Sequence, residues 1–399
     1  MSGSERMPGR LGLYVEGYRD RLLGLGYTPL SANTYSLVAL GQLGRWMASE
    51  DVDVDQLDSR AIKAFLTTRR TKDHRPAATA SLAPLLDYLR GEGVTPLEPV
   101  SALTPLDGLV GEYRDWLIVD RALAPETVRH REQFARRFLA ERMTPEDDLG
   151  VKNLTSAAVS AFVLRECERL KLSSVECYAN GLRSLLRFLH VRGYTACALA
   201  DCVPSVASWR DAGIPKVFPR VEIERLLRSC ERSSLSGARD FAILSLLARL
   251  GLRAVEVSRL RLADLYWRAG EIEVDGKAHR RDRLPLPSDV GEALVDYLSL
   301  RERRDISRVF LTLHAPIRPI EPSGVRTVVR EACRRAGLEP VGAHRLRHAL
   351  ASEMLRQDAS LFDIGQVLRH KNLTTTAIYA KVDFGRLREV AQPWPGVGR

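Results

Sequence analysis

The sequence predicts a mainly α-helical protein with a small antiparallel sheet near its C-terminal end. Apolar residues recur three and four positions apart along most of the chain, and one helical unit occurs twice in the N-terminal half. Only the third region contains a pair of alternating segments typical of a β-hairpin. At 399 residues, the chain is long enough for two or three domains with separate cores.

The repeat in the N-terminal half has an offset of roughly 95 to 100 residues. The segment YRDRLLGLGYTPLSANTYS near Tyr18 matches YRDWLIVDRALAPETVRHRE near Tyr113, and LAPLLDYLRGEGV matches LRSLLRFLHVRGY. Gly93 and Gly193 stand where a helix C-cap is expected in each copy. We expect two bundles of four or five helices each.

Prolines interrupt the chain between the two copies and again before the third region. These breakers are Pro96, Pro99 and Pro105, followed by Pro215 and Pro219. They predict three domains, covering residues 1–103, 104–212 and 213–399.

The third region mixes helices with the hairpin. A helix over 240–250 is expected to end at Gly251, which tolerates a positive φ. Segments 271–275 and 283–286 alternate as strands do, with Gly276 and Lys277 at the turn. The remaining apolar patterns predict helices over 323–336, 344–355, 360–368 and 374–379.

The net charge of +10 lies entirely in the C-terminal half. Residues 1–209 contain 26 Lys+Arg and 26 Asp+Glu, whereas residues 210–399 contain 34 and 24. Such a bias attracts polyanions, of which double-stranded DNA is the commonest. A solvated basic surface would give the same bias, so charge alone does not distinguish DNA binding from a solvated surface.

The composition also indicates the cellular compartment in which the protein is expected. No apolar run approaches the roughly 20 residues that cross a bilayer, and the first residues lack the apolar stretch of a signal peptide. We therefore expect a cytoplasmic protein with no membrane partner. The six cysteines show no zinc-ligand spacing, so we expect reduced, mostly buried thiols.

Cutting DNA without a metal requires a nucleophile, cations around the phosphate and an acid for the leaving oxygen. Arg253 follows Gly251, and Glu256 shares its helical face three residues later. Arg253 suits a phosphate clamp that Glu256 holds in place. An Arg–Glu pair at this spacing is otherwise usually a surface ion pair.

A second group lies in the segment GAHRLRHALAS, where His344 and Arg347 share a helical face. They suit a general base and a second phosphate clamp. The alternative is a metal site, because His344 and His348 are four residues apart. The neighbouring arginines and the absence of the H-E-x-x-H pattern argue against a metal.

Three further residues complete the candidate set. Lys277, at the hairpin turn, can protonate the leaving oxygen if DNA lies beside it, although a turn lysine is normally only solvated. The segment VLRHKNLTTTAIYAKV contains His370 and Tyr379. A helical tyrosine is more often a core residue than a nucleophile, so Tyr379 gains its meaning from the other groups.

The order R…K…H-x-x-R…H…Y resembles the tyrosine recombinase or phage integrase family, which includes lambda integrase, Cre and the Xer proteins. The resemblance runs from about residue 110 to 385 and implies two SAM-like helical bundles before an integrase-type catalytic domain. It implies that Arg253 and Arg347 clamp the phosphate and that Glu256 orients the site. Lys277 would be the general acid and His344 the general base. His370 would be the supporting histidine and Tyr379 the nucleophile. Many relatives have glycine where this chain has Arg369, which affects only the expected local turn.

By this resemblance, Tyr379 attacks a phosphodiester and forms a 3′-phosphotyrosyl link, and the freed 5′ hydroxyl attacks a partner strand. Neither ATP nor a metal is needed, and no cofactor is expected. Exchange takes place in a homo-tetramer on two DNA sites, or together with related recombinase partners. Residues 104–212 would bind the core site, and residues 1–103 would bind arm sites or assist assembly. The Pro393-Trp394-Pro395 ending is similar to that of recombinases of bacterial transposable elements.

Two other classes of protein share parts of this pattern. A DNA-binding regulator could keep the scaffold without the chemistry, but the complete set of reactive residues argues against it. A type IB topoisomerase uses similar chemistry without choosing a site, and the doubled helical region favours site recognition.

Overall fold

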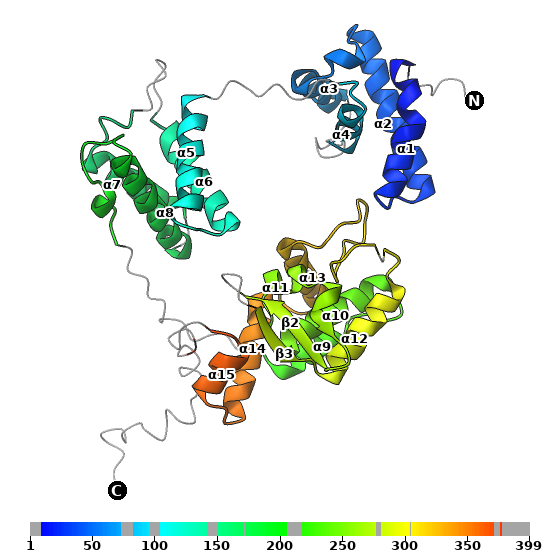
Figure 1. Cartoon of the computed structure of the whole chain (residues 1–399), viewed down its shortest axis with the longest axis vertical. Coiled ribbons are helices and arrows are strands. Elements are labelled where there is room, and N and C mark those ends of the chain that lie inside the picture. The colour runs from blue at the N-terminus through cyan, green and yellow to red at the C-terminus, as the bar shows by residue number, and fades with distance from the viewer. Residues whose placement is uncertain are drawn as a thin grey trace. The chain divides into compact units, whose positions relative to one another are not determined.

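The computed structural model describes residues 9–72, 83–95, 104–142, 150–170, 172–205, 218–276, 281–303, 305–370 and 376. The chain divides into two compact units, one formed by residues 98–213 and the other by residues 1–97 and 214–399. Helices dominate the described residues, and the strands form one antiparallel sheet (Figure 1). The predicted fold class is therefore confirmed. No helix within the described ranges is long and apolar enough to cross a membrane.

The first helical copy folds into a bundle with its own apolar core. Tyr18 and Leu22 of one helix pack in this core with Leu40 and Leu43 of the next. Thr28 caps the second helix by accepting a hydrogen bond from the backbone N–H of Ser31. The described elements are η2 (Gly9–Tyr14), α1 (Val15–Gly24), α2 (Pro29–Ser49), η3 (Val54–Gln56), α3 (Ser59–Lys72) and α4 (Ala83–Gly91).

The second copy repeats this architecture around a separate core, in which Tyr113, Trp116 and Phe188 contact one another. Its elements are α5 (Pro105–Val119), α6 (Pro125–Ala140), α7 (Ser156–Arg169), α8 (Leu172–Val191) and η5 (Ala200–Cys202). Gly93 and Gly193 follow the last helix of each copy at φ +70° and +77°, as the repeat predicts. Each copy thus contains four described α-helices. The three-domain division with boundaries near 104 and 212 stays a prediction.

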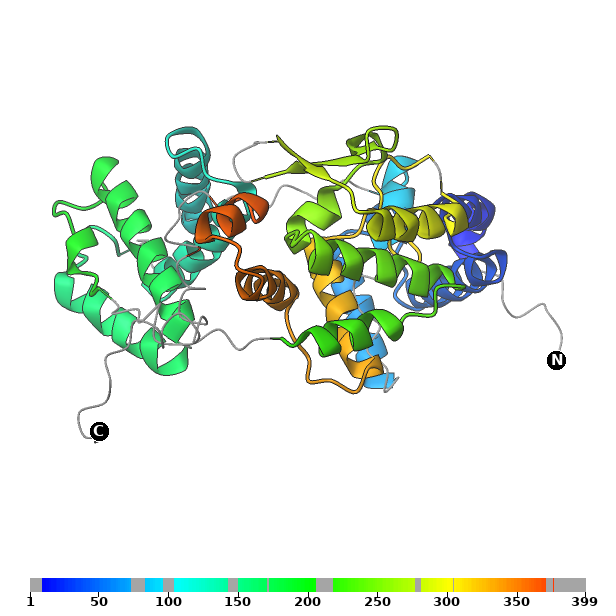
Figure 2. The same cartoon turned by 90° about the horizontal axis from the view of Figure 1, so that it is seen from below.

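The third region combines helices with the small sheet (Figure 2). The strand order of this sheet is β1-β2-β3. The predicted hairpin is confirmed, with Glu271 paired to Pro285 and Asp275 paired to Arg281. A short third strand, which the sequence did not predict, pairs with β2. The elements are α9 (Arg220–Arg228), α10 (Leu235–Arg249), α11 (Ala254–Arg259), η6 (Leu262–Asp264), β1 (Leu265–Tyr266), β2 (Glu271–Asp275), β3 (Arg281–Pro285), α12 (Ser288–Leu300), α13 (Pro322–Arg335), α14 (Ala343–Arg356) and α15 (Leu361–Val367).

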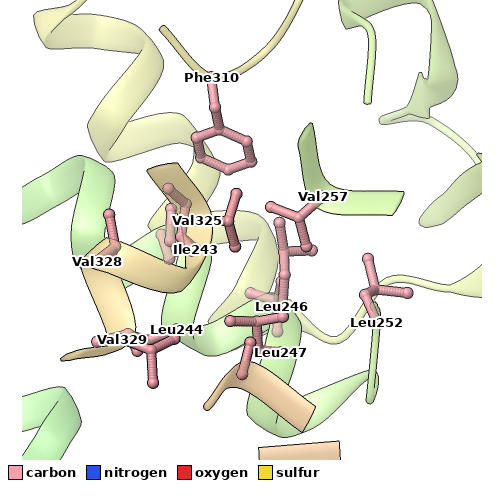
Figure 3. Packing of buried hydrophobic residues seen from close by; sticks show 14 of the residues in the cluster. Ile243, Leu244, Leu246, Leu247, Leu252, Val257, Phe310, Val325, Val328 and Val329 are labelled. Carbon is pink, nitrogen blue, oxygen red and sulfur yellow. The ribbon is translucent and has the colours of Figure 1, made fainter. Parts of the chain in front are cut away.

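Helix α10 forms the centre of this region and packs against α12, α13 and α14. Its side chains Ile243, Leu246 and Leu247 meet Val257 and Val325 in the main apolar cluster (Figure 3). The helix begins five residues earlier than predicted, because the Ser234 side chain caps it by accepting from the N–H of Gly237. It ends where the sequence predicts, since Gly251 has φ +59°.

The other predicted helices of this region match α13, α14 and α15 to within a residue at most termini. A helix over 374–379 was also predicted, and apart from Thr376 this segment lies outside the described residues. A smaller apolar cluster, formed by Ala351, Leu355, Ile364 and Leu368, joins α14 to α15.

The six cysteines are free, but the prediction that most are buried is wrong. Only Cys230 and Cys333 are buried. Cys177 is exposed because it lies on the outward face of α8, and Cys197 is exposed in the segment that follows this helix.

Candidate active site

Five of the seven predicted site residues lie in the described part of the third region. Arg253 and Glu256 belong to the start of α11, His344 and Arg347 to α14, and His370 follows α15. Lys277 and Tyr379 lie outside the described residues.

Arg253 stands at the N-cap of α11 and is joined to Glu256 by a capping box. The backbone N–H of Arg253 donates to Glu256 Oε2 at 2.8 Å, and Arg253 Nη1 donates to Oε1 at 2.6 Å. The Arg253 side chain is 34% exposed, whereas that of Glu256 is 1% exposed. A buried carboxylate thus holds a partly exposed guanidinium, unlike an ordinary surface ion pair.

Arg347 is fully buried and serves as a bridge between two loops. Its Nη1 donates to the carbonyl oxygen of Gly251, and its Nη2 donates to that of Leu368. The bridge fixes the break after α10 against the end of α15. Each of these two nitrogens carries a second N–H, so the guanidinium can donate to an anion while both carbonyl bonds stay in place.

The rings of His344 and His348 contact each other edge to face, with centroids 4.5 Å apart. Desolvation, Arg347 and Arg253 lower the pKa of His344. Desolvation and His344, together with neighbouring arginines, lower the pKa of His348 to about 4. Both imidazoles are therefore neutral near pH 7. Within the described ranges, no group of three His, Cys, Asp or Glu side chains is placed to hold a metal ion.

His370 lies in the turn after α15, where its Nδ1 is 2.7 Å from Thr376 Oγ1. Burial and the charges of Arg347 and Arg253 lower its pKa to about 4. Its backbone N–H donates to the carbonyl oxygen of Gly365. The turn thus holds a neutral imidazole close to both arginines.

Arg369 has a larger role than the sequence predicts. Its backbone has φ +55°, a region that favours glycine over residues with a Cβ. Its side chain is 8% exposed and donates to Glu256 Oε2 at 2.8 Å. A bulky cationic residue where glycine is expected was the signal in the sequence that Arg369 has a role. The sequence does not indicate that its partner is Glu256, 113 residues earlier.

Four predicted residues from distant segments therefore share one electrostatic environment. His370 responds to the charges of Arg253 and Arg347 and also to His344. Two arginines, Arg253 and Arg369, meet at the buried carboxylate of Glu256. Such a site attracts an anion with several oxygen acceptors, as a phosphodiester has.

Residues 216–386 match the model of the phage integrase family. The putative integrase/recombinase y4rA of Sinorhizobium fredii (strain NBRC 101917 / NGR234) is 38% identical over 394 residues, which cover 97% of this chain and 95% of y4rA. The tyrosine recombinase XerD of Listeria monocytogenes serotype 4b (strain F2365) is 29% identical over 300 residues, which cover 71% of this chain and 97% of XerD.

A solved structure of XerH site-specific recombinase, bound to its palindromic difH substrate in a post-cleavage complex, has a TM-score of 0.56 to this chain. The likeness covers 73% of this chain and 97% of the XerH chain at 18% identity, which establishes a shared fold. The match to y4rA extends over nearly the whole of both chains, so it includes the first helical bundle.

Proposed function

Because this chain belongs to the phage integrase family of tyrosine recombinases, we propose that it recombines DNA at specific sites through a 3′-phosphotyrosyl bond to Tyr379. One observation supports the proposal above all others. The charges of Arg253 and Arg347, which come from separate segments, lower the pKa of both His344 and His370. These are the residues that the family resemblance assigns to the reaction.

Arg253 is the side chain best placed to receive a phosphate. It is partly exposed, and Glu256 holds it at the start of α11 through a buried carboxylate. Its remaining donors would bind the non-bridging oxygens and stabilise the charge that develops on them. Arg347 would support the same phosphate through further N–H groups of its guanidinium.

The histidines suit proton transfer and hydrogen bonding rather than charge. A lowered pKa keeps His344 neutral near pH 7, so it can accept the proton of the Tyr379 hydroxyl as the phosphoester bond forms. Lys277 would then protonate the departing 5′ oxygen. The freed 5′ hydroxyl of a partner strand would attack the 3′-phosphotyrosyl bond and release Tyr379.

We further propose a homo-tetramer on two double-stranded DNA sites, with residues 104–212 and 213–399 as a clamp around each duplex. The +10 charge of the C-terminal half supports contact with the phosphate backbone. Residues 1–103 would contact arm sites or neighbouring subunits. The Pro-Trp-Pro ending supports a role in moving or integrating a mobile element.

A nicked suicide substrate tests the nucleophile. The wild type is expected to form a covalent protein–DNA adduct, and Tyr379→Phe to bind the same DNA without forming it. Tyr266→Phe, in β1 of the same region, is the matched control and should form the adduct. Cross-linking by Tyr379→Phe would show that the assignment is wrong.

Adduct formation and plasmid relaxation together separate the other classes of protein. A regulator would form no adduct at all. A type IB topoisomerase would relax supercoiled plasmids irrespective of their sequence, whereas a recombinase should act at the ends of its own element.

A further inference from the structure

We infer that Arg369 is a positioning residue for DNA cleavage, which acts by fixing the carboxylate of Glu256 and, through it, the guanidinium of Arg253. The inference rests on the proposed function, because it assumes that Arg253 binds the reacting phosphate. It concerns a buried arginine whose backbone lies in a region that favours glycine.

The backbone of Arg369 indicates that its side chain matters. A residue with a Cβ at φ +55° carries a conformational cost that glycine avoids. Desolvation of a side chain that is only 8% exposed adds to that cost and lowers the pKa of its guanidinium. The hydrogen-bonded ion pair with Glu256 is the described interaction that offsets both costs.

Glu256 receives hydrogen bonds from two arginines. Its Oε2 accepts from the backbone N–H of Arg253 and from Arg369 Nη2, each at 2.8 Å, and its Oε1 accepts from Arg253 Nη1 at 2.6 Å. With three donors, the plane of the carboxylate is fixed. Without Arg369, the carboxylate could turn about its last torsion and the Arg253 fork would turn with it.

Arg369 also connects the site to the sheet. The charge of Asp282, in β3, acts on the pKa of the Arg369 guanidinium in the same direction as that of Glu256 and opposes the effect of desolvation. Its Nε and Nη1 are buried and have no hydrogen-bond partner among the described residues. Arg369 thus belongs to the turn that carries His370, donates to the start of α11 and interacts electrostatically with β3.

Arg369→Gly tests the role because it removes the side chain and relieves the backbone strain together. We expect DNA affinity and the free energy of unfolding to change little, while the rate of adduct formation on a suicide substrate falls about 10- to 100-fold. Arg369→Lys keeps one cationic donor and should restore part of the rate. Asp358→Gly, which relieves a φ of +61° at an exposed residue, should leave the rate unchanged.

A double-mutant cycle tests the route through Glu256. In a Glu256→Gln background, Arg369→Gly should cause little further loss, because the carboxylate it positions is already gone. Independent, multiplicative losses would overturn the inference, as would a wild-type rate in Arg369→Gly. Arg369 would have a structural role instead if Arg369→Gly lowered the free energy of unfolding by as much as it raised the activation free energy of adduct formation.

The wild type and Tyr379→Phe are assayed alongside these variants. An adduct that persists in Tyr379→Phe counts against the proposed nucleophile, whatever the Arg369 variants do. An adduct that depends on Tyr379 but not on Arg369 counts against this inference alone.

Discussion

Arg347 donates a hydrogen bond to the carbonyl oxygen of Gly251, which joins α14 to the break after α10 across 96 residues of sequence. Gly251 makes this contact at φ +59°. Two residues further on, the chain reaches Arg253 at the start of α11. The conformation of one glycine therefore sets the relation between both predicted phosphate clamps.

Gly251→Ala should destabilise the protein more than the same substitution at a positive-φ glycine that has room for the added Cβ. A Cβ at this position would lie 2.8 Å from Leu368 Cδ2 and 3.0 Å from Leu350 Cδ2, so packing strain adds to the cost of the positive φ. We expect a loss of about 2–4 kcal/mol in the free energy of unfolding, measured by denaturant titration.

The matched control is Gly270→Ala. Gly270 has φ +63°, and its added Cβ would have nothing within 4 Å, so only the backbone cost of about 1–2 kcal/mol applies. Equal losses in the two variants would contradict the packing argument. Gly251→Ala should also slow DNA cleavage, because both arginines depend on this segment.

Stability should fall as pH falls from 6.5 towards 4. Burial and nearby cations lower the pKa of His370 and His348 from 6.5 to about 4 in the folded protein. Between these values the unfolded chain binds more protons, so acid favours unfolding, by up to about 1.4 kcal/mol per pH unit for each histidine. Above pH 6.5 this contribution to stability is complete.

His370→Gln removes one of these titrating groups and keeps a hydrogen-bonding side chain. The free energy of unfolding of the DNA-free variant should therefore decrease less between pH 6.5 and 4 than that of the wild type. His314→Gln, at an exposed position, serves as control and should follow the wild type. Parallel profiles for His370→Gln and wild type would contradict the lowered pKa.

Cleavage should continue in the presence of EDTA. His344 and His348 lie edge to face, but Arg347 and Arg345 lie close enough to lower the pKa of His348, and the same charges oppose a bound cation. We expect equal rates of adduct formation with and without the chelator, measured on a suicide substrate. Loss of cleavage that added Mg²⁺ or Zn²⁺ restores would favour the metal interpretation of these two histidines.

Local patterns were sufficient to predict much of the fold. Alternation at Glu271–Asp275 predicts the hairpin, and Gly251 ends its helix because positive φ is a local preference. The short β1 strand was missed because two residues, Leu265 and Tyr266, cannot show a period.

The site was less predictable than the fold, because its contacts join residues far apart in the sequence. Helical spacing places His344 and Arg347 on one face, but it does not reveal that Arg347 is buried against the carbonyl of Leu368. Nor does it pair Arg369 with Glu256. Both facts depend on how α14 and α15 pack against the start of α11.

The two predicted phosphate clamps should respond differently to conservative substitution. Arg253→Lys keeps a cation beside Glu256 at a position whose side chain is 34% exposed, so stability should change by less than about 1 kcal/mol. Arg347→Lys cannot donate to the carbonyls of Gly251 and Leu368 in the same geometry. A buried carbonyl left without its partner costs about 1–3 kcal/mol, so this variant should unfold more readily.

Both lysine variants should slow adduct formation by about 100-fold or more, because an ammonium cannot reproduce a forked contact with a phosphate. Denaturant titration and a suicide-substrate assay on the same preparations separate the two effects. If Arg347→Lys cleaves DNA at the wild-type rate, the role of Arg347 is limited to its hydrogen-bonded bridge between the two loops. If Arg347→Lys instead kept wild-type stability and lost cleavage, its contacts with the carbonyls would be dispensable and its main role would lie at the phosphate.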